Sequence, residues 1–363
     1  MLNFAVGPVM MAPEIREIGA EEIPYFRTPE FSALMKENEE MMCRLMRAPE
    51  GSRTVFLTGS GTAAMEAAVM NMFTPEDYVL VINGGSFGAR FAKLCRIHHI
   101  PYEEILPERG KGITRGDLDA AAGRGFTGLL INIDETSTGV LYDMEMVGGF
   151  CREHGICLVA DAISSFLADD FRMEDWGADL VLTGSQKALA LPPGLSVLTI
   201  SPAGLDRIES HEVESLYFDL KDYLKNGERG QTPYTPAVSV LLQLHRRLSD
   251  LTARGLSAEL SRAAGIARDF RERIRDLPLE IVSDSLSNAV TPLHPTGHYA
   301  DGTPVSARKV FEILKDEYDI FVCPNGGDLE NLVFRVGHIG NLTAGDNEKL
   351  VAAFRDLMRR GLL

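Results

Sequence analysis

Short apolar runs alternate with longer amphipathic runs over the first two thirds of the chain. Each apolar run is followed by small or polar residues, and segments with helical spacing separate the runs. This alternation predicts a mostly parallel sheet with helices on both faces. Because ligands of such sheets bind at the carboxyl ends of the strands, the polar residues that follow each run are the first candidates for a site. The apolar runs are RTVFLT at 53–58, DYVLVI at 77–82, GLLINI at 128–133, ICLVAD at 156–161 and ADLVLT at 178–183.

The pattern changes near residue 250. A long segment with helical spacing covers 256–277, and shorter strand-like and helical segments follow it to the C-terminus. A chain of 363 residues is also longer than a single core usually supports. We therefore expect an N-terminal arm over 1–20, a large α/β domain over 21–255, and a smaller α+β domain over 256–363.

Composition and charge narrow the classes of function. The net charge of −16 disfavours nucleic acids and anionic membranes as partners. No run of about 18 apolar residues is present, and the first residues carry no basic segment typical of a signal peptide. The five cysteines include no CxxC pair, and the eight histidines show no HExxH spacing. We therefore expect a cytoplasmic protein with no metal site and no membrane segment.

The turn TGSGTAAMEAA at 58–68 is a candidate phosphate site. Gly59 and Gly61 allow close approach of the backbone, and Ser60, Thr62 and the first N–H groups of the following helix can hold an anion. The spacing is neither GxGxxG nor GxxxxGK[ST], which disfavours a dinucleotide or a nucleoside triphosphate. An ordinary helix-capping turn remains the alternative for this segment alone.

Two charged residues follow the last two predicted strands. Asp161 ends the run CLVAD, where a carboxylate needs a partner or caps the next turn. Lys187 follows ADLVLTGSQ, where it is either a surface lysine or a reactive amine. A phosphate turn, an aspartate and a lysine, each at a strand end, together match the needs of pyridoxal 5′-phosphate (PLP), which uses them for its phosphate, ring nitrogen and aldehyde.

With these motifs in hand, the sequence resembles the class V, fold-type I PLP-dependent aminotransferases. That group includes alanine–glyoxylate, serine–pyruvate and 2-aminoethylphosphonate–pyruvate transaminases. The resemblance covers nearly the whole chain. It rests on GSGTAAMEAA (59–68), ETSTGVLYD (135–143), VADAISS (159–165), TGSQKALALPPG (183–194) and FRVGHIG (334–340).

The resemblance implies a role for individual residues. Lys187 matches the lysine that forms the Schiff base and then moves the proton, and Asp161 matches the partner of the ring nitrogen. Arg335 matches the arginine that binds the substrate carboxylate, and its planar fork suits a carboxylate. The remaining cofactor residues are implied in the same way: Ser60, Gly61, Thr62 and Gln186 near the phosphate, Phe87 and Ile163 against the ring, and Ser137 beside the phenolic oxygen.

The same resemblance implies a homodimer with active sites at the subunit interface. The segment GQTPYTPAVS at 230–239 matches a part of the family that reaches the phosphate in the neighbouring subunit. Thr235 is the best match, and Thr232 and Tyr234 are alternatives. Some members of the family have a tyrosine at the position of Thr232, so the chain departs from them there.

The substrate is the least determined feature. The implied reaction moves an amino group from alanine, serine or 2-aminoethylphosphonate to a 2-oxo acid such as pyruvate or glyoxylate. Arg27 either supplies a second positive charge for a doubly anionic substrate or pairs with an acid of the Glu-rich helix predicted at 29–47. Two other functions stay open: a lyase resembling cysteine desulfurase, for which Cys323 is the candidate thiol, and a non-catalytic PLP-binding homologue.

Overall fold

Seven strands form the larger of the two main sheets, in the order β2-β10-β9-β8-β5-β3-β4. All neighbours pair in parallel except β10, which runs antiparallel to both β2 and β9. All five apolar runs form strands of this sheet, which confirms the predicted, mostly parallel α/β architecture. The strands are β2 (Arg53–Thr58), β3 (Val79–Ile82), β4 (Tyr102–Ile105), β5 (Gly128–Asn132), β8 (Cys157–Asp161), β9 (Leu180–Gly184) and β10 (Leu195–Ile200).

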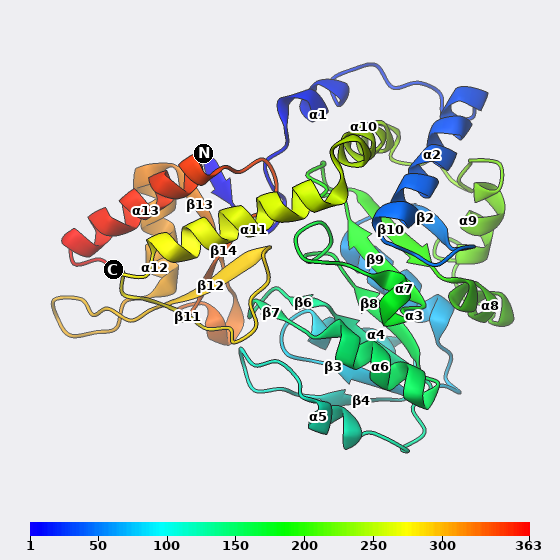
Figure 1. Cartoon of the computed structure of the whole chain (residues 1–363), viewed down its shortest axis with the longest axis horizontal. Coiled ribbons are helices and arrows are strands. Elements are labelled where there is room, and N and C mark those ends of the chain that lie inside the picture. The colour runs from blue at the N-terminus through cyan, green and yellow to red at the C-terminus, as the bar shows by residue number, and fades with distance from the viewer.

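Helices cover both faces of this sheet in the computed structural model, which describes residues 1–363 (Figure 1). Successive residues of one strand enter different cores: Leu129 and Ile131 of β5 join one apolar cluster, and Leu130 joins another. This explains why the strands are apolar throughout instead of alternating. The helices of this part are α1 (Pro13–Ile18), α2 (Pro29–Leu45), α3 (Gly61–Met72), α4 (Gly88–Ile97), α5 (Arg115–Asp119), α6 (Met144–His154), α7 (Met173–Trp176), α8 (Pro202–Ser210), α9 (Leu220–Gly227) and α10 (Val238–Arg254).

A second sheet contains strands from both ends of the chain, in the order β1-β13-β14-β12-β11. The segment predicted as an extended arm supplies β1, which pairs in parallel with β13, and Phe4 is fully buried beside Val322 and Phe334 in a third core. The strands are β1 (Leu2–Phe4), β11 (Leu279–Ile281), β12 (Val290–Pro295), β13 (Ile320–Pro324) and β14 (Phe334–Gly337).

Helices α11 (Leu256–Arg273), α12 (Ala307–Tyr318) and α13 (Ala344–Arg359) accompany the second sheet, and α11 spans the middle of the molecule in Figure 1. Gly255, with φ of +84°, separates α10 from α11. The division of the chain into domains at 255/256 stays a prediction. None of the helices is long and apolar enough to cross a lipid bilayer.

Parallel pairing brings the candidate polar segments to one edge of the larger sheet. Strands β2, β9, β8, β5 and β3 all point the same way, so the loops that follow them leave from the same edge. The loop after β5 includes a small hairpin of β6 (Asp134–Glu135) and β7 (Val140–Leu141). A site made from several distant segments is therefore built at this edge.

Candidate active site

Lys187 lies in the loop that joins β9 to β10, under the N-terminal arm. A Cβ atom added to Gly7 would stand 2.5 Å from Cδ of Lys187, and the backbone N–H of Val9 donates to the carbonyl of Gln186 at 3.2 Å. Burial lowers the pKa of the Lys187 amine. The positive charge of Arg335 acts in the same direction, whereas nearby acidic groups oppose it. A lysine with a lowered pKa is suited to proton transfer.

Asp161 ends β8, and its side chain is buried. Its Oδ2 accepts a hydrogen bond from Nδ2 of Asn132 at 2.5 Å, and its Oδ1 accepts one from the N–H of Ile163 at 2.7 Å. Burial raises the pKa of Asp161 to about 6, although both hydrogen bonds act against the shift. The carboxylate forms no ion pair within the chain. A protonated ring nitrogen would supply the missing cation, so the residue fits the base of a PLP site.

The turn before α3 presents unpaired polar groups, as an anion site requires. Ser60 caps the helix without a side-chain hydrogen bond to it, and Thr62 is exposed. A Cβ on Gly61 would stand 2.4 Å from Cδ1 of Ile163, so the turn lies against the side chain of Ile163. Oε1 of Gln186 is buried without a hydrogen-bond partner. These groups fit a phosphate at the start of α3.

Phe87 and Ser137 are joined through Glu135, a residue that the sequence analysis did not select. The carboxylate of Glu135 accepts from the N–H groups of Phe87 at 3.2 Å and Gly88 at 2.9 Å, and from the hydroxyl of Ser137. A carboxylate at the start of α4 is stabilised by the free N–H groups of the helix. Glu135 therefore fixes the loop after β3 to the loop after β5. Its signal in the sequence was a carboxylate directly after an apolar strand, in IDETSTG.

Arg335 on β14 faces a cavity of about 630 Å³ that Phe87 and Ser137 also line. Its Nη1 donates to the carbonyl of Thr136 at 3.2 Å and its Nη2 to the carbonyl of Pro324 at 2.8 Å. Its Nε is buried without a partner, and no carboxylate of the chain pairs with it. This guanidinium thus lacks an anion, which suits a substrate carboxylate.

Arg109 lines the same cavity and was not selected from the sequence. It is exposed, and it forms no ion pair or hydrogen bond within the chain. From the sequence, the segment PERGKG after β4 indicated only a basic loop. Arg109 adds a second positive charge to the cavity of Arg335.

Arg27 lies away from this cavity within its own chain. Its guanidinium is within 3.4 Å of Oε1 of Gln231 and of the carbonyl of Pro233, and it stacks on the ring of Phe26. It forms no ion pair with the Glu-rich helix α2, so that alternative is wrong. Arg27 is instead held beside the segment 230–239.

Of the hydroxyl groups of Thr232, Tyr234 and Thr235, only that of Thr235 is free. Thr235 is exposed and forms no hydrogen bond within the chain. Thr232 is buried and donates to the carbonyl of Tyr234 at 2.6 Å, whereas the hydroxyl of Tyr234 donates to the carbonyl of Leu216 at 2.8 Å. Thr235 is therefore the residue of the three that is available to a ligand.

Cys323 lies on β13 directly opposite Arg335 of β14. Its Sγ is 3.8 Å from the carbonyl oxygen of Pro324. The thiol is thus part of a paired strand, whereas the desulfurase alternative needs a mobile loop. The five cysteines are all unpaired, and no three His, Cys, Asp or Glu side chains are grouped so as to hold a metal ion.

The strand-end lysine, the buried aspartate and the glycine-rich turn on this sheet define a PLP-dependent enzyme of fold type I. The family model described as "Aminotransferase class-V" matches residues 25–284. The chain therefore belongs to the class-V aminotransferase family. It is a PLP-dependent aminotransferase, which decides against the lyase and non-catalytic alternatives.

The proteins that resemble this chain include a hydrogenase subunit as well as aminotransferases. The chain is 30% identical over 308 residues to the small subunit of a soluble hydrogenase from Synechococcus sp., covering 83% of this chain and 78% of the relative. It is 28% identical over 355 residues to the L-aspartate–glyoxylate aminotransferase of Paracoccus denitrificans, covering 94% and 86%. The crystal structure of an aspartate aminotransferase of subgroup IV from Thermus thermophilus superposes with a TM-score of 0.91 at 27% identity, over 100% of both chains.

Proposed function

We propose that this aminotransferase moves the amino group of a small amino compound to a 2-oxo acid such as pyruvate or glyoxylate. Alanine, serine and 2-aminoethylphosphonate are the first candidate donors. One observation carries the proposal: Arg335 faces the cavity beside Phe87 and Ser137, and it has no carboxylate partner in the chain. An amino acid or a 2-oxo acid supplies that carboxylate. Binding of the carboxylate to Arg335 would hold the substrate in position for the reaction.

Each cofactor contact has a residue that fits it. Lys187 would hold the aldehyde carbon of PLP, and Asp161 would pair with its ring nitrogen. When bound, PLP accepts the electrons of the bond that breaks at the amino-bearing carbon. The other contacts are Ser60, Gly61, Thr62 and Gln186 at the phosphate, Phe87 and Ile163 at the ring faces, and Ser137 at the phenolic oxygen.

Lys187 would also carry the proton. Its pKa is lowered mainly by burial, so a larger share of the amine is neutral than for an exposed lysine. A neutral amine can take the proton from the amino-bearing carbon of the substrate and return it one position along. The Lys187 side chain occupies space that a side chain on residue 7 would fill, so Gly7 makes room for it.

We infer that the active enzyme is a homodimer. Thr235 has a free hydroxyl on the surface, next to the stacked rings of Tyr234 and Tyr217, whose centroids are 5.3 Å apart. Large apolar side chains are exposed on the neighbouring segments: Leu216 is 77% exposed and Tyr25 is 67% exposed. A partner subunit would cover this surface and place its own cofactor phosphate near Thr235. The cytoplasmic location predicted from the cysteines is part of the same proposal.

The donor has a second anionic group if Arg109 takes part in binding. Arg109 and Arg335 line one cavity and neither has an acidic partner. A dicarboxylic amino acid or an aminophosphonate would satisfy both charges. Arg27 is an alternative source of this second charge. It is held against Gln231 and Pro233, in the same segment as Thr235, and would reach the cavity of a partner subunit.

An absorbance titration of the purified holoenzyme tests the proposal. Donors are added one at a time, and pyruvate or glyoxylate follows. We expect one donor to convert the visible band of lysine-bound PLP to the shorter-wavelength band of the amino form, and the oxo acid to restore it. A band that no amino donor changes would contradict transamination. The absence of a visible band with added PLP would contradict the role of Lys187.

A further inference from the structure

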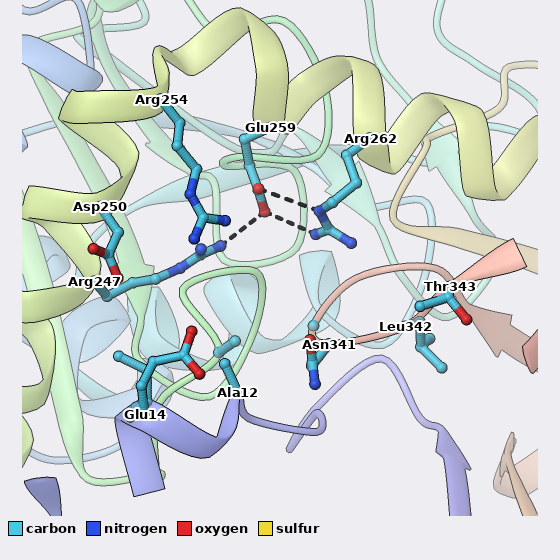
Figure 2. Close-up of a pocket in the computed structure, with 13 residues that line it drawn as sticks. Ala12, Glu14, Arg247, Asp250, Arg254, Glu259, Arg262, Asn341, Leu342 and Thr343 are labelled. Carbon is cyan, nitrogen blue, oxygen red and sulfur yellow. Dashed lines mark hydrogen bonds and ion pairs between the residues drawn. The ribbon is translucent and has the colours of Figure 1, made fainter. Parts of the chain in front are cut away.

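A second cavity, of about 220 Å³, lies outside the active site. It is enclosed by the start of α1, the elbow between α10 and α11, and the loop before α13 (Figure 2). None of the residues that line it also lines the cavity of Arg335. With Ala190 of the loop after β9, four different parts of the chain therefore meet around this space.

Three arginines and three carboxylates line this cavity: Arg247, Arg254 and Arg262, with Glu14, Asp250 and Glu259. The carboxylate of Glu259, only 7% exposed, accepts from Arg247 at 2.8 Å and from Arg262 at 2.8 and 3.2 Å. One carboxylate cannot neutralise two guanidinium groups, so Arg247, Glu259 and Arg262 together carry one positive charge. The cluster sits in a chain whose net charge is −16, and its sign is thus opposite to that of the protein.

Arg254 brings a third guanidinium to the same cavity. Figure 2 shows its side chain pointing from the end of α10 toward Arg247. Arg254 is exposed, and its side chain forms no hydrogen bond or ion pair in the chain. Of the remaining acids, Asp250 is bound by Arg246 at 3.0 Å, and only Glu14 is without a partner. Because Arg246, outside the lining, balances Asp250, three lining arginines are set against Glu259 and Glu14, an excess of one positive charge.

Like-charged guanidinium groups that converge on one space repel each other unless an anion lies between them. Their planar forks match the oxygens of a carboxylate or a phosphate. The cavity is smaller than the roughly 300–1,000 Å³ of sites for drug-sized ligands, which favours a small anion. We propose that this cavity is a binding site for a small oxyanion, held by Arg247 and Arg254.

The site is connected to the reactive lysine by hydrogen bonds. Nε of Arg247 donates to the carbonyl of Leu189 at 3.2 Å, and its Nη2 donates to the carbonyl of Ala188 at 3.3 Å. These carbonyls belong to the two residues that follow Lys187. Ala190, next in the loop, also lines the cavity. An anion bound to Arg247 would therefore contact the same guanidinium that holds the loop after Lys187. This inference does not depend on which amino donor the enzyme uses.

The test is calorimetric titration of the PLP-loaded enzyme with inorganic phosphate, at ionic strength matched with chloride. Malonate replaces phosphate in a second arm, so that the two arms distinguish a phosphate ligand from a carboxylate ligand. The variant is Arg254→Ala. The matched control is Arg268→Ala, because Arg268 is an exposed arginine of α11 that has no partner and lies outside the cavity.

We expect the wild-type and Arg268→Ala proteins to bind one of the two anions with the same Kd. We expect Arg254→Ala to bind it about tenfold more weakly, as for the loss of one hydrogen bond to a charged group. Equal binding by all three proteins, or no binding to the wild type, would overturn the proposal. Loss of binding in Arg335→Lys with Arg254→Ala unaffected would also overturn it, because the anion would then occupy the substrate cavity.

Discussion

Gly7 and Lys187 are in direct contact although 180 residues separate them in the chain. A Cβ atom on Gly7 would stand 2.5 Å from Cδ and 2.9 Å from Cε of Lys187, and the φ angle of Gly7 is +141°. The contact exists because β1 joins the second sheet, after which the chain crosses the loop between β9 and β10. The N-terminal arm is therefore one wall of the lysine site.

Gly7→Ala should displace the lysine or the arm. Both the backbone angle and the missing space oppose a side chain, so we expect a loss of about 1–3 kcal/mol in stability. Misplacement of the amine should lower kcat by up to about 100-fold. The control is Gly149→Ala, because a Cβ at Gly149 meets no atom within 4 Å. Steady-state kinetics and thermal unfolding of both variants measure the difference, and wild-type behaviour of Gly7→Ala would refute the contact.

Lys187→Arg should remove catalysis while keeping the charge. A guanidinium stays protonated at neutral pH and cannot act as the base, so kcat should fall by at least about 10²–10⁴-fold. The visible band of lysine-bound PLP should disappear. The control is Lys93→Arg, since Lys93 is an exposed lysine of α4 without a partner. Kinetics and an absorbance spectrum decide the matter, and a variant with a normal spectrum would show that another lysine holds the cofactor.

Asp134 should make the apoprotein less stable as the pH rises. Burial and the negative charge of Asp169 raise the pKa of Asp134 from 3.8 to about 8. The folded state thus keeps a proton that the unfolded state loses above about pH 4. Stability from this group is complete below pH 4 and declines up to about pH 8, by at most about 1.4 kcal/mol per pH unit.

Asp134→Asn should remove that decline, because the amide does not ionise. Thermal unfolding of the wild-type and variant apoproteins between pH 5 and pH 8 measures it. We expect the Tm of the variant to change less with pH than the Tm of the wild type. Parallel Tm profiles would contradict a protonated Asp134 in the folded state.

Arg335→Lys should weaken binding of both the amino acid and the oxo acid. Lysine keeps the charge but loses the planar fork, and hydrogen bonds to charged groups are worth about 1.5–3 kcal/mol. We expect kcat/KM to fall by about 10- to 100-fold, mostly through KM. The rate with the oxo acid and the rate with the amino donor should fall together. An unchanged KM for both substrates would place the carboxylate elsewhere.

Arg109→Gln and Arg27→Ala separate the two candidates for a second anion. If Arg109 contacts the donor, Arg109→Gln should lower kcat/KM for aspartate by about tenfold and leave alanine nearly unchanged. Arg27→Ala should show the same selectivity only if Arg27 reaches the cavity of a partner. Kinetics of both variants with aspartate, 2-aminoethylphosphonate and alanine provide the comparison. Equal losses on all three donors would exclude that arginine from recognising a second charge.

Several parts of the fold could be predicted because they depend on local patterns. The run GLLINI is apolar on both sides of the strand, and β5 indeed sends Leu129 and Leu130 into different cores. Helix α2 begins at Pro29 with Thr28 as its cap, close to the start expected from the spacing. The partner of the first strand was not predictable, since pairing between residues 2 and 320 leaves no signal in either segment.

The candidate site divides in the same way. Asp161 and Lys187 follow strands that pair side by side, so the βα order was enough to place them at one edge. Glu135 and Arg109 were missed because, in the sequence, they look like any other glutamate and arginine. What distinguishes them is their neighbours: the N–H groups of α4 for Glu135 and the cavity of Arg335 for Arg109.

The sequence by itself determined the class of sheet, the cofactor and the residues that match the motifs of the family, because these depend on short segments and on their order. Only the tertiary structure decided that Gly7 contacts Lys187, that Arg27 does not pair with α2, and that Arg247 anchors the loop after the lysine. The physical reason is that burial and charge pairing arise between segments far apart in the chain. They are properties of the packed molecule, and no single segment contains them.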